Sequence, residues 1–193
     1  MALQNRVLPT GVIVADPARG LFTGNRGCLH DDQKRLGNAR WKGRAWIICA
    51  LEFKDWQRQV MTPRSWTELF FLDEAVALAA GHRPCALCRR KAYQAYRAAW
   101  GGEPKAVEMD AALHAARLGK RVWRDCKDLP DGVFIRVSGQ AFLLSARRMR
   151  PYFPAGYGAA VDRVEGVVEV LTPTRTVAVL LAGYLPVLHG SAG

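Results

Sequence analysis

Two cysteines three positions apart, Cys85 and Cys88, constrain the fold of this chain more than any other feature. They lie in the run Gly81-His82-Arg83-Pro84-Cys85-Ala86-Leu87-Cys88-Arg89-Arg90. A turn of this spacing lets both sulfurs face one metal ion, and the neighbouring arginines favour thiolate over thiol. A redox pair would follow a strand, whereas this pair follows a predicted helix and a glycine. The pattern therefore predicts half of a tetrahedral zinc site.

The other two zinc ligands have to come from elsewhere in the chain. Cys28 in a glycine-rich turn and Cys49 in an apolar segment are the preferred choice. His30 is the alternative that replaces one of them, and a small buried core residue is the alternative interpretation of Cys49. Cys126 is interpreted as a spare thiol. Four thiolates would close a structural site, whereas three protein ligands would leave a position for water or substrate.

The hydrophobic pattern predicts an α+β protein in two parts. Extended segments are expected over 21–29, 44–53, 66–72, 133–137, 141–145 and 164–171, and helices over 74–80, 89–100, 106–118 and after Thr172. Asp73 is the expected N-cap of the first helix, and Gly81 is its expected end. Residues 120–130 and 151–158 are expected as connector and loop. We expect a zinc-pinned sheet with helices over 1–101, and a helix with a small, mostly β subdomain packed against it over 102–193.

The chain is strongly basic, with 28 Lys and Arg against 17 Asp and Glu and a net charge of +11. An excess of this size favours a polyanionic partner, and we expect nucleic acid, DNA ahead of RNA. Basic and aromatic residues alternate around the cysteines, a pattern suited to phosphate contact and base stacking. The candidate nucleic-acid contacts are Arg26, Arg40, Trp41, Lys42, Trp56, Arg83, Arg89 and Arg90.

Targeting signals are not apparent in the sequence. Residues 1–20 show no signal-peptide pattern, and the longest apolar run, 177–182, is too short to span a membrane. Five cysteines, an odd number, together with this pattern favour a reducing cytoplasm and metal ligation over disulfides. We therefore expect a cytoplasmic protein with no membrane partner, and the sequence predicts no oligomeric state.

One stretch of about twenty residues resembles a known family. It is the run Phe70-Phe71-Leu72-Asp73-Glu74-Ala75-Val76-Ala77-Leu78-Ala79-Ala80-Gly81-His82-Arg83-Pro84-Cys85-Ala86-Leu87-Cys88-Arg89. It resembles the second half of the zinc-binding domain of the Ada methylation-response family: an Ala/Glu-rich helix, Gly, an aromatic residue, Arg-Pro-Cys, two residues, Cys and Arg. The resemblance implies that Cys85 and Cys88 form the second of two cysteine pairs that hold zinc in a DNA-contacting domain.

The first cysteine pair of that family does not match this chain. In the family the first two cysteines follow a strand and have three residues between them. One of these two cysteines accepts a methyl group from a DNA phosphotriester. Here Cys28 and Cys49 are 21 positions apart. Ligands from separate strands remain compatible with a zinc site, and a variant module with a His/Cys first half is equally compatible with the resemblance.

Three hypotheses for function follow. The first is a nucleic-acid-binding protein in which zinc is mainly structural. The second is a zinc-dependent hydrolase acting on nucleic acid or another anionic substrate; Asp110 and His114, four apart on a predicted helix, are a candidate acid–base pair. The third is an alkyl-acceptor DNA repair protein that uses Cys28 or Cys49.

Overall fold

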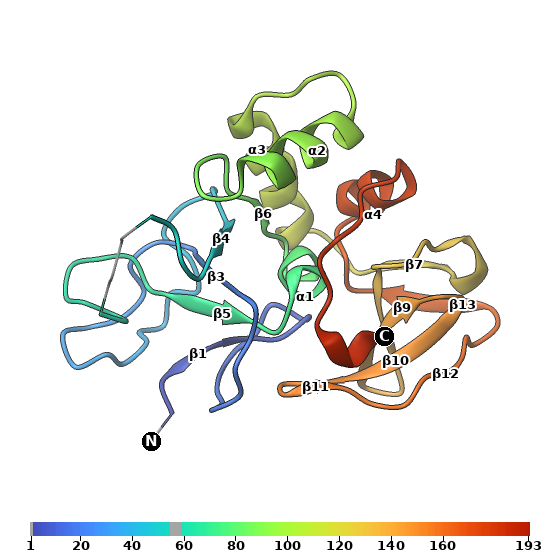
Figure 1. Cartoon of the computed structure of the whole chain (residues 1–193), viewed down its shortest axis with the longest axis horizontal. Coiled ribbons are helices and arrows are strands. Elements are labelled where there is room, and N and C mark those ends of the chain that lie inside the picture. Colours follow the sequence, from blue (N-terminus) through green and yellow to red (C-terminus); the bar gives the residue numbers. More distant parts are fainter. Residues whose placement is uncertain (1, 55–58) are drawn as a thin grey trace.

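Two β-sheets lie on either side of a short central helix (Figure 1). Figure 1 draws the computed structural model, which describes residues 2–54 and 59–193. Helices and sheets of mixed and antiparallel pairing are combined in one chain, so the predicted α+β class is confirmed.

The first sheet carries the residues of the candidate metal centre. Its strands are β1 (Gln4–Val7), β2 (Ile13–Ala15), β3 (Phe22–Asn25), β4 (Ile47–Ala50), β5 (Leu69–Phe71) and β6 (Arg83–Pro84). Their spatial order is β2-β1-β5-β3-β4-β6. Strand β4 is antiparallel to β3, with Cys49 opposite Thr23, and parallel to β6, with Ile48 opposite Pro84. The residue that follows β6 therefore lies beside Cys49.

The second sheet is antiparallel throughout its described pairs. Its strands are β7 (Val122–Asp125), β8 (Phe134–Val137), β9 (Gln140–Ser145), β10 (Arg148–Phe153), β11 (Gly156–Tyr157), β12 (Val161–Asp162) and β13 (Val167–Val170). The order is β11-β10-β9-β8-β13-β7, and β12 pairs with β10. Ser138 and Gly139, with φ of 47° and 84°, form the two-residue turn between β8 and β9, so the predicted hairpin is confirmed.

The helices of the described residues are α1 (Glu74–Ala79), α2 (Arg90–Trp100), α3 (Ala106–Leu118) and α4 (Thr174–Leu181), with short 3₁₀ turns at Cys126–Asp128 and Gly190–Ala192. Every residue of α1 is buried. Asp73 caps it as predicted, because its Oδ1 accepts a hydrogen bond from the Val76 amide at 3.0 Å. Gly81 then turns the chain away with φ of +87°, which a residue with a Cβ adopts at a cost.

Several elements differ from the sequence expectations. Strand β7 lies inside the expected connector. It is a strand because it pairs with β13, whereas its own residues show no apolar pattern that predicts one. Strands β10 and β11 occupy the expected loop 151–158, where pairing with β9 overrides the local turn preference of proline and glycine. Thr172 does not cap α4, since its hydroxyl accepts from the Phe134 amide; Pro173 occupies the cap position without a side-chain hydrogen bond.

One hydrophobic cluster joins the two parts of the chain. Phe71 and Leu78 from the first part belong to the same buried cluster as Phe134, Leu143 and Val177 from the second. The ranges 1–101 and 102–193 therefore share a core. Among the described residues, every helix is too short or too polar to cross a membrane.

Candidate metal centre

Three cysteines converge at the edge of the first sheet. The sulfur atoms of Cys49, Cys85 and Cys88 all lie within 4.8 Å of one another. The parallel pairing of β4 with β6 causes this convergence: the Cys85 amide donates to the Ile48 carbonyl at 2.9 Å, which fixes Cys85 beside Cys49. Cys49 is thus a member of the cluster and more than a small core residue.

The turn between Cys85 and Cys88 directs backbone groups at sulfur. The Leu87 amide donates to Cys85 Sγ at 3.4 Å, and the Arg89 amide donates to the Cys85 carbonyl at 3.2 Å. Hydrogen bonds from the thiols of Cys49 and Cys88 lower the pKa of Cys85 well below that of a free thiol, while the same hydrogen bonding raises the pKa of Cys49. The cluster therefore favours a thiolate at Cys85, the form that binds metals.

Of the four expected ligands, the structure groups Cys49, Cys85 and Cys88, whereas Cys28 and the alternative ligand His30 lie outside this group. Cys28 Sγ lies 3.8 Å from the His30 carbonyl oxygen. Both His30 ring nitrogens have partners, the Thr67 hydroxyl at 2.6 Å and the Thr62 carbonyl at 3.2 Å. The reason is strand direction: Cys49 is opposite Thr23, and Asn25 is opposite Ile47, so the end of β3 that leads to Cys28 points away from Cys49.

A cavity of about 390 Å³ opens beside the three sulfurs. All three cysteines line it, together with mainly apolar and aromatic side chains such as Phe53 and Phe70, and the described lining includes one carboxylate, Glu68. Glu68 is buried and its Oε2 accepts from the Met61 amide at 2.6 Å. A small molecule that enters this cavity would meet the thiol cluster directly.

The predicted nucleic-acid contacts divide into buried and exposed residues. Arg83 is buried and holds both oxygens of Asp110 at 2.8 Å, and Arg89 is paired with Glu74 at 2.8 Å, so both guanidiniums stabilise the fold. Arg26 is also buried. The exposed members are Arg40, Trp41, Lys42 and Arg90. Trp56 lies outside the described residues.

The two residues of the candidate acid–base pair on α3, Asp110 and His114, contact different neighbours. Asp110 is occupied by Arg83 through both of its oxygens, as described above. His114 packs edge-on against Trp41, with ring centroids 5.8 Å apart, and its Nδ1 has no hydrogen-bond partner in the described part of the chain. In this arrangement Asp110 does not orient the imidazole.

Sequence reasoning missed Arg117, which lies in the last turn of α3. Its guanidinium lies 4.0 Å from the ring centroid of Trp46, and the Arg26 guanidinium lies 3.9 Å from the same centroid. Two groups this close to one centroid must lie on opposite faces of the indole. No local pattern identifies this stack, because its members are far apart in the sequence.

Comparison with protein-family models, curated proteins and solved structures finds no match to this chain.

Proposed function

We propose that this protein binds zinc through Cys49, Cys85 and Cys88 and binds nucleic acid through its basic surface. The observation that carries the metal part is the convergence of three thiols within 4.8 Å. The net charge of +11, with exposed basic side chains near the thiol cluster such as Arg90, supports the nucleic-acid part.

The donor set fits zinc. Tetrahedral zinc with Zn–S bonds of about 2.3 Å places its sulfurs about 3.8 Å apart, a separation compatible with three sulfurs that all lie within 4.8 Å of one another. The described group contains neither a carboxylate nor an imidazole, and soft sulfur ligands of this kind disfavour magnesium and calcium. Zinc bound here would hold the end of β4 against the turn after β6.

Metal content tests this assignment. Mass spectrometry under native and then denaturing conditions should detect one zinc in the wild type, and loss of that zinc in Cys49→Ser, Cys85→Ser and Cys88→Ser. Cys28→Ser, Cys126→Ser and His30→Ala are the matched controls and should retain it. A wild type without metal, or a Cys49→Ser variant that keeps its zinc, would disprove the three-thiolate site.

Nucleic-acid binding is tested by its dependence on salt. Affinity for a DNA duplex should fall as salt rises, and the double variant Lys42→Gln/Arg90→Gln should reduce the logarithmic slope by about 1.8 if each side chain neutralises one phosphate. Arg124→Gln/Lys127→Gln removes the same charge from exposed positions at the second sheet. Equal losses in both double variants would show that net charge alone, and no defined surface, attracts the DNA.

The cavity beside the sulfurs favours a second candidate, a zinc-dependent hydrolase. Zinc held by three protein ligands has a fourth position for water or substrate. In the described residues the cavity walls are largely apolar and contribute one carboxylate, Glu68, which would accept a proton there. The test is zinc-dependent cleavage of an activated phosphodiester. Cleavage should be lost in Glu68→Gln with zinc content unchanged; no cleavage by the zinc-loaded wild type would remove this candidate.

The Ada resemblance supports the metal proposal only in part. The family pattern places its first two cysteines with three residues between them after a strand, and here the residue four positions after Cys49 is Phe53. Phe53 lines the cavity. We infer an Ada-like site in which an apolar side chain stands where the family has its remaining thiol.

A further inference from the structure

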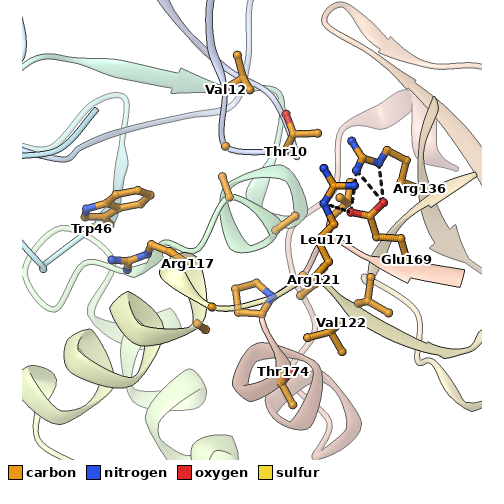
Figure 2. A pocket seen from close by; sticks show the side chains of 18 of the residues that line it. Thr10, Val12, Trp46, Arg117, Arg121, Val122, Arg136, Glu169, Leu171 and Thr174 are labelled. Carbon is orange, nitrogen blue, oxygen red and sulfur yellow. Dashed lines mark hydrogen bonds and ion pairs between the residues drawn. The ribbon is translucent and has the colours of Figure 1, made fainter. Parts of the chain in front are cut away.

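A second cavity, of about 630 Å³, lies where the two parts of the chain meet (Figure 2). The turn between β1 and β2, the segment before β4, the ends of α1 and α3, and the connection from β13 to α4 all contribute walls. Its volume is in the range of cavities that bind small molecules. Since no cysteine lines it, this cavity is separate from the candidate metal centre.

Positive charge dominates the walls of this cavity. Its described lining contains six basic side chains and one carboxylate: Arg26, Arg40, Arg117, Lys120, Arg121, Arg136 and Glu169. The carboxylate is already neutralised, because Glu169 accepts from Arg136 at 2.8 and 2.7 Å and pairs with Arg121 at 3.4 Å (Figure 2). The remaining cations have no further acid to balance them among the described residues that line the cavity.

Arg26 is the buried member of this set, with 2% of its surface exposed. Its Nε donates to His82 Nε2 at 3.3 Å and its Nη1 to the Gly11 carbonyl at 2.9 Å, but its Nη2 has no hydrogen-bond partner in the described residues. Gly11, which lines the cavity, lies directly beside this nitrogen. Burial, together with the charge of Arg117, lowers the pKa of Arg26 to about 9. A buried donor of this kind is satisfied by an anion.

The two tryptophans that line the cavity, Trp41 and Trp46, differ in whether a ligand ring can stack on them. Arg26 and Arg117 already cover both faces of Trp46, and Arg117 donates its other hydrogen bonds to the carbonyls of Gly81 and Arg44. Trp41 also lines the cavity and keeps 40% of its surface exposed. Trp41 is therefore the indole on which a planar ligand ring can stack.

We propose that this cavity binds a nucleotide, with a phosphate oxygen accepting from Arg26 Nη2 and the base stacking on Trp41. Guanidinium groups match phosphate geometry, and the cavity has room for a base beside them. The nucleotide is either a free mononucleotide or one unit of a nucleic-acid chain. The inference deepens the proposed nucleic-acid binding and does not depend on the metal.

Two neighbouring alanines of α3 allow a matched test that leaves Arg26 in place. Ala116 lines the cavity and Ala115 does not, although both are exposed. Calorimetric titration of the full chain with adenosine monophosphate should detect binding. Ala116→Glu, which adds a carboxylate to the wall, should weaken this binding by about tenfold or more, and Ala115→Glu should leave it unchanged. Trp41→Ala should weaken binding of the nucleotide but not of inorganic phosphate. Arg26→Gln should weaken both.

The outcomes separate this inference from the proposed function. If the wild type binds neither phosphate nor the nucleotide, or if both alanine variants lose the same affinity, the cavity assignment is wrong, even where DNA binding persists. Nucleotide binding with no binding of a short single-stranded oligonucleotide supports a free mononucleotide as the ligand, and the salt dependence of duplex binding then decides the nucleic-acid proposal separately. Competition between the oligonucleotide and the mononucleotide supports a unit of the chain.

Discussion

At the scale of single residues, His82 links the core to the second cavity through Arg26. Its Nδ1 donates to the Ala77 carbonyl at 3.2 Å, which leaves Nε2 to accept from Arg26. Complete burial, followed by the charges of Arg26 and Arg117, lowers its pKa well below the usual value. The neutral ring is therefore the form that positions the Arg26 guanidinium.

This neutral histidine predicts a loss of stability in acid. The unfolded chain binds a proton below about pH 6.5 and the folded chain does not, so the stabilisation is complete above pH 6.5 and is lost as pH falls. Between about pH 7.5 and about pH 5, urea denaturation should show the wild type losing ~2 kcal/mol more than His82→Gln. Protonation of the metal ligands affects both proteins alike, so equal losses would contradict a neutral His82.

At the scale of elements, α1 depends on a buried cap that also holds the end of the chain. The Asp73 carboxylate accepts from the Val76 amide, from the Tyr157 hydroxyl at 2.7 Å and from the His189 amide at 3.1 Å. The adjacent Glu74 accepts from the Tyr184 hydroxyl and from the Val187 amide. These contacts fasten the last ten residues of the chain to the central helix.

Removing the Asp73 cap should therefore lower the free energy of unfolding by more than the removal of an ordinary helix cap does. Asp73→Ala leaves a buried hydroxyl and two amides without their acceptor, and we expect the free energy of unfolding to fall by roughly 3 kcal/mol or more. Asp125→Ala removes a surface cap from the turn Cys126–Asp128 and should cost about 1 kcal/mol or less. Chemical denaturation measures both, and similar losses would show that the Tyr157 and His189 contacts contribute little.

At the scale of the whole molecule, the shared core predicts that the two parts of the chain unfold together. The metal centre belongs to the first sheet, and Cys126, whose thiol is buried, lies next to the second. Release of zinc and alkylation of Cys126, followed by peptide mass mapping, should have the same urea midpoint. Two separate midpoints would show that 1–101 and 102–193 are independent domains.

Local chemistry made much of the secondary structure predictable. The limits of α3 are as expected, and Asp73, Gly81 and the turn at Ser138-Gly139 act through contacts within a few residues, which a sequence displays directly. Strands β7 and β10 were not predictable in this way. Strand β7 is stabilised by β13, which lies far away in the sequence, and β10 itself contains Pro151, a residue that locally favours a turn.

The sequence by itself determined that the Cys85 and Cys88 thiols lie close together, because a spacing of three positions in one turn brings the two sulfurs to the same side. Of the two further ligands that the sequence suggested, Cys28 and Cys49, only the tertiary structure showed that Cys49 alone lies beside the pair, because the register of β4 against β6 decides which distant thiol is close. The same holds for the second cavity. Its charge is visible in the composition, but the stack of Arg26, Trp46 and Arg117 exists only where segments from both parts of the chain meet.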